Sequence, residues 1–228
     1  MRYTWLFFDA DDTLFDYPKA EERALAATLA EFELPALAGV LPAYREINQA
    51  VWREFEQGTI SAVDLRLVRF VRLFERLGFN GKVEAFSQRY LVHLSQSSVL
   101  IEGVQSLLAR LAKDYRLGLV TNGLPEVQRP RLVSAGITGF FEFEAISEEL
   151  GISKPDPRFF QAALTLAGNP DPARVLVIGD SLNSDIRGGC QAGLDTLWYN
   201  PARLPADPRW PPAYEVHTLS EILSLLAP

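Results

Sequence analysis

Four carboxylates stand close together near the start of the chain. Asp9, Asp11, Asp12 and Asp16 fall within eight positions, directly after the apolar run of residues 5–8. Carboxylates that lie so close destabilise one another unless a positive charge lies between them. The cluster therefore indicates either a solvated acidic turn or a site that binds a cation.

Two further carboxylates follow another apolar run much later in the chain. Asp180 and Asp185 come after residues 175–178. Ligands of open α/β sheets bind beyond the carboxyl ends of the strands, so we expect both side chains to converge with Asp9. Magnesium prefers carboxylate oxygens and keeps several waters. The sequence therefore predicts a magnesium site at this edge of the sheet.

Polar residues beside other apolar runs could bind a phosphate. Thr121 and Asn122 follow residues 117–120, and Lys154 precedes a helix expected from Asp156. Lys154 supplies a fixed positive charge, which a phosphate needs and a purely structural metal site does not. Thr121 offers a hydroxyl group, and backbone N–H groups near Asn122 can donate to phosphate oxygens. A plain Asn-Gly turn remains the alternative for Thr121 and Asn122.

Asp9 and Asp11 could divide the work of catalysis. Side chains at positions i and i+2 of a regular strand share a face, so both carboxylates could reach one phosphorus atom. Asp9, next to the metal and Lys154, is expected to stay ionised and to act as the nucleophile. Asp11 would then give a proton to the leaving oxygen and later take one from water.

Short apolar runs that recur along the chain must position these residues. They predict strands at residues 5–8, 117–120, 143–146, 175–178 and 194–199, with a last short strand near 214–216. Continuous apolar runs are typical of strands buried on both faces of a parallel sheet. Helical patterns separate them, so we expect an α/β fold, a three-layer Rossmann-like core around a central parallel sheet.

The core helices have recognisable starts and ends. Pro125 should open a helix that Gly136 closes, although Pro130 inside it could bend the helix or shift its start. Asn183 could cap a helix that runs to about residue 192, and Thr218 with Glu221 forms a capping box for the last helix. Two more helices are expected over residues 104–113 and from Asp156 to about 167.

Residues 17–98 break this rhythm, because they contain no convincing strand. They are typical of about four amphipathic helices, at residues 19–32, 41–57, 61–77 and 82–95. We interpret this segment as a helical module inserted after the first strand. The catalytic core would then comprise residues 1–16 and 99–228.

Composition excludes several classes of protein. The formal net charge is −7 and no basic stripe is visible, which argues against binding to a nucleic acid polymer. No apolar run approaches the roughly 18 residues of a membrane span. The chain has one cysteine, Cys190, so it forms no intrachain disulfide. We expect a cytoplasmic protein that acts on a small molecule, and the sequence leaves its oligomeric state open.

Four segments resemble, in order, the signature motifs of the haloacid dehalogenase (HAD) superfamily: FFDADDTL, LVTNG, SKPDP and VIGDSLNSD. The helical segment of residues 17–98, after the first motif, resembles the type-1 cap of that superfamily, which implies that it sets substrate specificity. The resemblance implies that Asp9 is the nucleophile and Asp11 the acid/base. It also implies that Thr121 and Lys154 bind the transferring phosphoryl group. The presence of Asp11 argues against dehalogenation, because dehalogenases of the superfamily lack that acid.

The resemblance also implies a set of magnesium ligands. Asp9, the backbone carbonyl of Asp11 and Asp180 would hold the ion, and Asp185 would support it through water. These residues, taken with the motifs, predict a magnesium-dependent phosphomonoester hydrolase that works through an aspartyl-phosphate.

A finer resemblance indicates a substrate class. The pieces FFDADDTLF, GTIS, ISEELGISKP and AGNPDPARVLVIGDS are similar to the pyrimidine 5′-nucleotidase branch, and an acid at Asp12 replaces the glycine of most relatives. The expected substrates are UMP, dUMP and dTMP. The alternatives are a sugar-phosphate or other small-metabolite phosphatase, a phosphomutase, and a non-catalytic scaffold on the same fold.

Several residues have two interpretations at this stage. Trp52, Phe55 and Tyr90 could stack on a nucleobase, although aromatic residues at helical spacing are more often core. Asp16 could cap the first helix of the segment or face the substrate cavity.

Overall fold

The computed structural model describes residues 2–226, and within them six parallel strands form one sheet. The strand order is β3-β2-β1-β4-β5-β6, so the order reverses at β1. A reversal of this kind opens a crevice at the carboxyl ends of the strands, where ligands of α/β proteins bind. The strands are β1 (Trp5–Phe8), β2 (Arg116–Thr121), β3 (Phe143–Ile146), β4 (Val175–Gly179), β5 (Asp195–Tyr199) and β6 (Tyr214–Val216).

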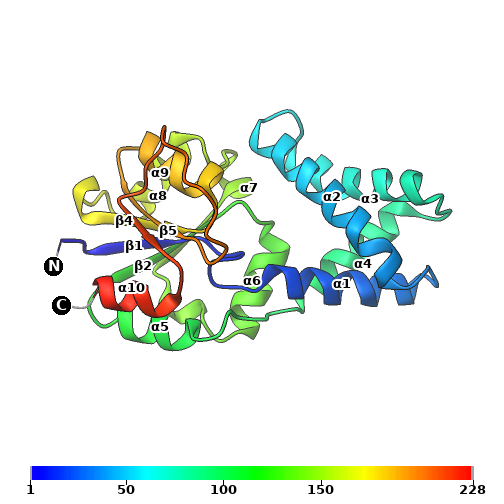
Figure 1. Ribbon diagram of the computed structural model, residues 1–228, viewed down its shortest axis with the longest axis horizontal. Helices are drawn as coiled ribbons and strands as arrows, with labels where there is room; N and C mark the ends of the chain where they lie inside the picture. The colour runs from blue at the N-terminus through cyan, green and yellow to red at the C-terminus, as the bar shows by residue number, and fades with distance from the viewer. Residues whose placement is uncertain (1, 227–228) are drawn as a thin grey trace.

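Helices cover both faces of the sheet (Figure 1). Leu6 and Phe8 of β1 pack in one apolar cluster, and Trp5 and Phe7 pack in another on the opposite face. This alternation explains why β1 is apolar at every position, and it confirms the predicted three-layer α/β fold. The longer core helices are α5 (Val104–Leu111), α6 (Pro125–Ser134), α8 (Pro157–Leu166) and α10 (Leu219–Leu226).

The predicted helix after β4 is two elements with a different start. A π-helical turn, η3 (Leu182–Ile186), leads into the short helix α9 (Arg187–Gln191). The N-cap is Ser181, whose hydroxyl accepts a hydrogen bond from the backbone N–H of Ser184 at 3.2 Å. Asn183 is therefore not the cap. The remaining short elements are η1 (Thr138–Phe140), α7 (Ser147–Leu150) and η2 (Pro172–Arg174).

Two other local predictions concern helix starts. The side chain of Glu221 accepts from the backbone N–H of Thr218 at 3.3 Å, and Thr218 Oγ1 accepts from that of Glu221 at 3.4 Å, which confirms the capping box. Helix α6 begins at Pro125 and continues through Pro130, so the interior proline does not move its start.

Four helices lie between β1 and α5 in the sequence and form a unit beside the sheet (Figure 1). They share an apolar cluster of their own, which Leu124 and Val127 at the start of α6 also join. Helix α6 is thus the part of the core on which these helices, here called the cap helices, rest. No helix in residues 2–226 is both long and apolar enough to span a membrane. The cap helices are α1 (Tyr17–Glu31), α2 (Leu37–Glu56), α3 (Ala62–Leu77) and α4 (Val83–Ser95).

Two connecting segments, residues 9–16 and 96–103, join the cap helices to the core. They lie side by side, because the backbone N–H of Asp16 donates to the carbonyl of Val99 at 2.9 Å and Phe15 bridges to Leu100. The Asp16 carboxylate accepts from the backbone N–H of Lys19 at 3.1 Å and so caps α1. Of the two roles left open for Asp16, the structure favours helix capping.

Candidate active site

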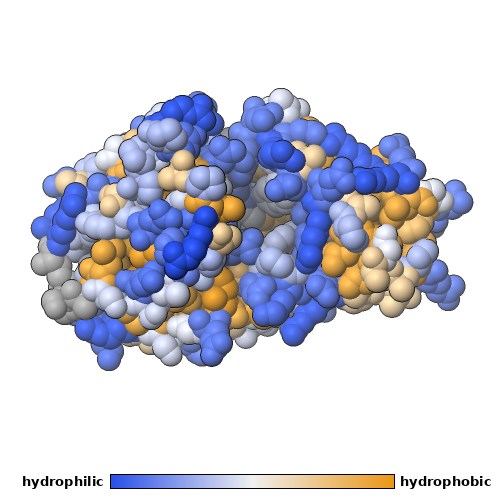
Figure 2. Space-filling model, in the orientation of Figure 1, coloured by the Kyte–Doolittle hydropathy of each residue, from blue (hydrophilic) through white to orange (hydrophobic). Residues whose placement is uncertain are grey.

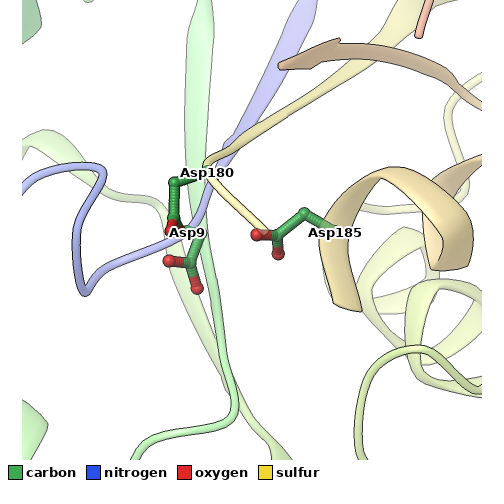
Figure 3. A group of neighbouring side chains, drawn as sticks. All are labelled: Asp9, Asp180 and Asp185. Atoms are coloured by element: carbon green, nitrogen blue, oxygen red, sulfur yellow. The ribbon is translucent and has the colours of Figure 1, made fainter. Parts of the chain in front are cut away.

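Three carboxylates meet at the carboxyl ends of β1 and β4. Asp9 follows β1 directly, Asp180 follows β4, and Asp185 lies on η3. One oxygen atom of each lies within 4.8 Å of the others. Figure 3 shows the three side chains gathered around the tips of these strands. The structure therefore brings together the acids that the sequence analysis selected as metal ligands, and their role as ligands remains a prediction.

The position of Asp185 depends on a glycine at the end of β4. A Cβ atom on Gly179 would lie 2.3 Å from the Asp185 carboxyl carbon, so any side chain there would displace the carboxylate. The backbone N–H of Ser181 donates to Asp185 Oδ2 at 3.1 Å. These contacts hold one oxygen of Asp185 against the turn and leave the other for the site.

Lys154 lies between two of the carboxylates and is almost completely buried. Its Nζ donates to Asp9 Oδ1 and to Asp185 Oδ1, each at 2.6 Å, and to the Val120 carbonyl at 3.0 Å. Burial lowers the pKa of Lys154, but Asp185 and Asp9 outweigh it and raise that pKa above its usual value. Lys154 is therefore a fixed cation in the neutral pH range.

Thr121 and Asn122 stand beside Lys154 at the end of β2. The Asn122 amide forms two hydrogen bonds with the backbone of Lys154, donating to its carbonyl and accepting from its N–H, both at 2.9 Å. Thr121 Oγ1 accepts from the backbone N–H of Gly123 at 3.0 Å and is buried. Asn122 thus fixes the backbone that carries the ammonium group, and Thr121 keeps its hydroxyl proton free to donate.

The site holds three carboxyl groups for one ammonium group. Burial raises the pKa of Asp9 to about 8, Lys154 opposes that rise, and Asp185 adds to it. Burial also raises the pKa of Asp180 well above its usual range, and the Asp9 and Asp185 charges add to the effect. A hard divalent cation with oxygen ligands would relieve this excess, so the residues present fit magnesium.

Asp11 does not point into the group of three carboxylates. Its Oδ2 accepts from Gln128 Nε2 and its Oδ1 from Arg131 Nη1, both at 2.6 Å. The expectation that Asp9 and Asp11 share a strand face is wrong, because β1 ends at Phe8 and Asp11 lies in the turn beyond it. A metal contact through the Asp11 carbonyl remains a prediction.

Asp12 adopts a conformation that explains its place in the motif. Its φ is +60°, in the left-handed region, where Asp is found several times more often than most other side chains. The same conformation suits the glycine expected in most relatives at this position. We therefore assign Asp12 to the shape of the turn.

A cavity of about 200 Å³ joins these residues to the cap helices. Figure 2 shows a hollow with largely hydrophilic walls between the core and the cap helices. Tyr17, Trp52 and Glu56 line the cavity from the cap side. Phe55 and Tyr90 instead pack in the apolar cluster of the cap, so only Trp52 of the three suggested aromatic residues faces the site.

Glu56 was not identified from the sequence. Burial raises the pKa of Glu56 to about 7, the Asp185 charge adds to the rise, and Lys154 and Arg187 oppose it. The available signal was its spacing, because Glu56 follows Trp52 by four residues and so lies on the same face of α2.

Comparisons with known proteins agree with this geometry. Residues 3–193 match the family model of haloacid dehalogenase-like hydrolases. The pyrimidine 5′-nucleotidase PynA of Streptococcus pneumoniae is 36% identical over 227 residues, 99% of this chain and 96% of the relative. The pyrimidine 5′-nucleotidase YjjG of Escherichia coli is 33% identical over 226 residues, 99% of both chains.

A solved structure is similar over the whole chain. The crystal structure of the HAD-hydrolase YfnB from Bacillus subtilis, bound to magnesium and described as revealing interdomain movement, matches with a TM-score of 0.93 at 34% identity. The match covers 100% of both chains. The chain therefore belongs to the haloacid dehalogenase-like hydrolase family, and it is an enzyme related to the phosphatases of that family.

Proposed function

We propose that the protein is a magnesium-dependent phosphomonoester hydrolase that works through a phosphorylated Asp9. The observation that carries this proposal is the position of Lys154, buried between Asp9 and Asp185 with Asp180 beside them. Such a site has an excess of negative charge for a divalent cation. It also has a fixed ammonium group for a phosphate that would otherwise be repelled.

The contacts assign a task to each residue. Lys154 engages Oδ1 of Asp9, which leaves Oδ2 as the oxygen for attack on phosphorus. A bond forms between Asp9 and the phosphorus, and the bond to the ester oxygen breaks as that oxygen takes a proton from Asp11. Water then gives a proton to Asp11 and attacks the phosphorus, which releases inorganic phosphate and restores the Asp9 carboxylate.

The charged groups around the phosphoryl group supply most of the catalysis. Lys154 and the Thr121 hydroxyl would bind its oxygens as negative charge moves through the transition state. Magnesium held by Asp9, Asp180 and the Asp11 carbonyl, with Asp185 behind it, would neutralise charge on the same oxygens. Dehalogenation lacks support, because it would leave Asp11 without a task.

We assign pyrimidine nucleoside monophosphates as the substrate class. Support comes from PynA and YjjG, two relatives of full length that are named as pyrimidine 5′-nucleotidases. The cavity supports it as well, because Trp52 offers an aromatic surface on the cap side. Base–aromatic stacking contributes roughly 1–3 kcal/mol per base. A sugar-phosphate phosphatase would need no such surface.

A phosphate-release screen tests this function. The protein would be assayed with magnesium on UMP, dUMP, dTMP and a panel of sugar phosphates, with the Asp9→Asn variant as the control for contaminating phosphatases. We expect magnesium-dependent release with the highest kcat/KM on the pyrimidine nucleotides. Equal values on sugar phosphates would contradict the nucleotidase assignment. Transfer of phosphate between sugar positions without release would indicate a phosphomutase, and no turnover of any ester would leave the scaffold alternative.

A further inference from the structure

Two buried polar side chains of α6 hold the carboxylate of Asp11, and the reaction described above gives them no task. Gln128 is 1% exposed and Arg131 is 0% exposed, yet each donates a hydrogen bond of 2.6 Å to a carboxylate oxygen of Asp11. They are three residues apart and so share a face of the helix. Asp11 keeps 28% of its side chain exposed and lines the cavity. The pair thus fixes a carboxylate whose free edge faces the substrate space.

The first glycine after β2 makes room for this arrangement. A Cβ atom on Gly123 would lie 2.1 Å from Gln128 Nε2 and 2.8 Å from its Cδ. Any side chain at Gly123 would therefore push the Gln128 amide away from Asp11. The glycine of the segment LVTNG is therefore needed to make room for the Gln128 side chain. This requirement is separate from the phosphate contacts proposed for Thr121.

Arg131 also contacts both connecting segments between the core and the cap helices. Its Nε donates to the Ser97 carbonyl at 3.2 Å, and its guanidinium lies 4.1 Å from the centre of the Phe15 ring. Ser97 belongs to the returning segment and Phe15 to the outgoing one. One guanidinium group therefore contacts Asp11 and both connecting segments between the core and the cap helices.

We propose that Gln128 and Arg131 are positioning residues that hold Asp11 at the leaving oxygen of the substrate. The inference rests on the proposed function, because it needs Asp11 to protonate the leaving group. Two directed hydrogen bonds restrict a carboxylate that would otherwise rotate freely at the rim of the cavity, and positioning of this kind lowers the barrier to proton transfer. Neither residue touches the substrate in this account.

The choice of leaving group separates positioning from a general loss of structure. A sugar hydroxyl leaves as an unstable alkoxide unless it is protonated, whereas p-nitrophenolate leaves readily without a proton. The value of kcat/KM reports steps up to departure of the leaving group, so later hydrolysis of the phosphorylated enzyme does not affect it. A fault in positioning Asp11 must therefore lower kcat/KM for UMP more than for p-nitrophenyl phosphate.

The central experiment uses the Gln128→Leu variant, which keeps the side-chain volume and removes the donor. We expect the ratio of kcat/KM for UMP to that for p-nitrophenyl phosphate to fall by about 10-fold or more, and by no more than the roughly 10²–10⁴-fold that general acid catalysis contributes as a whole. Asp11→Asn should lower the same ratio further. Combining Gln128→Leu with Asp11→Asn should lower it no more than Asp11→Asn alone, because positioning matters only while the acid is present.

Matched variants on the same helix guard against misfolding as an explanation. Arg129 is exposed and pairs with Glu144 and Glu149, so Arg129→Met should leave the ratio unchanged. Arg131→Lys, which keeps the positive charge, should retain more of the ratio than Arg131→Met. If Arg131→Met does not fold, the Gln128→Leu comparison still decides the question.

The outcomes distinguish this inference from the proposed function. Equal losses on both substrates, or no loss, in a folded Gln128→Leu protein would overturn the positioning role while wild-type turnover of UMP upholds the function. An unchanged ratio in Asp11→Asn would also overturn it. If the wild type turns over another alkyl phosphate but not UMP, the nucleotide assignment fails and that ester replaces UMP in the ratio. If it hydrolyses no ester, the function and the inference both fail.

Discussion

The active site and the interior of the cap both bury charged side chains, but they balance that charge differently. The polar cluster of the cap comprises Glu21, Asn48 and Arg69. Asn48 Nδ2 donates to Glu21 Oε1 at 3.2 Å, and Asn48 Oδ1 accepts from Arg69 Nη1 at 3.2 Å. Glu21 also accepts from Arg45 at 2.8 Å. Two arginines, Arg45 and Arg69, therefore offset the charge of the one buried acid in the cap cluster.

The active site has no such balance. One ammonium group, Lys154, faces the buried carboxylates of Asp9 and Asp185, and the half-buried carboxylate of Asp180 lies beside them. A buried acid whose charge is offset by nearby cations of the same fold serves structure. An excess of acidic groups with too few cations of the fold beside them indicates a site that binds a ligand of opposite sign. The comparison predicts that removing an acid from the site costs activity and little stability, and that breaking the cap cluster costs stability and little chemistry.

The largest effect is expected for Asp9→Asn. This variant loses the nucleophile, so phosphate release should fall by about 10⁴-fold or more, in line with removal of other enzyme nucleophiles. The free energy of unfolding measured without magnesium, at a pH above the pKa of about 8 of Asp9, should stay constant or rise, because one buried negative charge is gone. Near-normal turnover by the folded variant would refute the role of Asp9.

Removal of magnesium should stop turnover reversibly. A chelator should abolish phosphate release, and added magnesium should restore it. Full activity in excess chelator would refute the metal assignment.

The pH dependence of stability should report the same excess charge. The pKa of Asp9 is about 8 in the folded protein and usually 3.8, so the folded state holds more protons between these values. The free energy of unfolding without metal should therefore fall as pH rises through this range.

Magnesium at about 100 times its Kd should raise the Tm by about 5–10 °C. This rise should be larger at pH 8 than at pH 6, and an equal rise would count against an electrostatic cause.

The cap cluster should respond in the opposite way. Asn48→Leu keeps the volume but leaves Glu21 and Arg69 each without one hydrogen bond, at a cost of about 1–3 kcal/mol for each stranded group. We expect a lower midpoint in urea and a kcat/KM for p-nitrophenyl phosphate within a few-fold of wild type. Gln49→Leu changes an exposed neighbour on the same helix and should affect neither quantity. A large fall in kcat/KM for Asn48→Leu with an unchanged urea midpoint would contradict the structural role of the cap cluster.

The smallest effect concerns the wall of the cavity. Trp52→Ala should raise the KM for UMP by roughly 5- to 100-fold, as expected for a lost stacking contact. Trp52→Phe should raise the KM for UMP less than Trp52→Ala does, because phenylalanine keeps part of the aromatic surface. The KM for a small sugar phosphate should hardly change. Equal changes in KM on both substrates would show that Trp52 supports the cap rather than the base.

Much of the fold could be predicted from the sequence because its signals are local. The apolar runs 5–8 and 143–146 became β1 and β3 with the same bounds, since strands buried on both faces need apolar residues throughout. The convergence of Asp9 and Lys154, 145 residues apart, followed from the rule that ligands gather at strand ends.

Other features depend on contacts that no local pattern contains. The i, i+2 argument failed for Asp11 because the strand ends before it, and strand alternation has no meaning in a turn. Gln128 and Arg131 look like surface residues of a polar helix until α6 is placed beside the first motif. Glu56 likewise gains its importance only when α2 is placed over the site.

The central claim is that Asp9 carries the phosphoryl group, and one measurement tests it directly. The protein would be mixed with magnesium and UMP or p-nitrophenyl phosphate, quenched in acid within the first turnovers, digested and analysed by mass spectrometry. We predict a phosphate adduct on the peptide that contains Asp9, absent when a chelator is present and absent in Asp9→Asn. Phosphate release by an enzyme that carries no adduct at any quench time, or an adduct on another residue, would contradict the account.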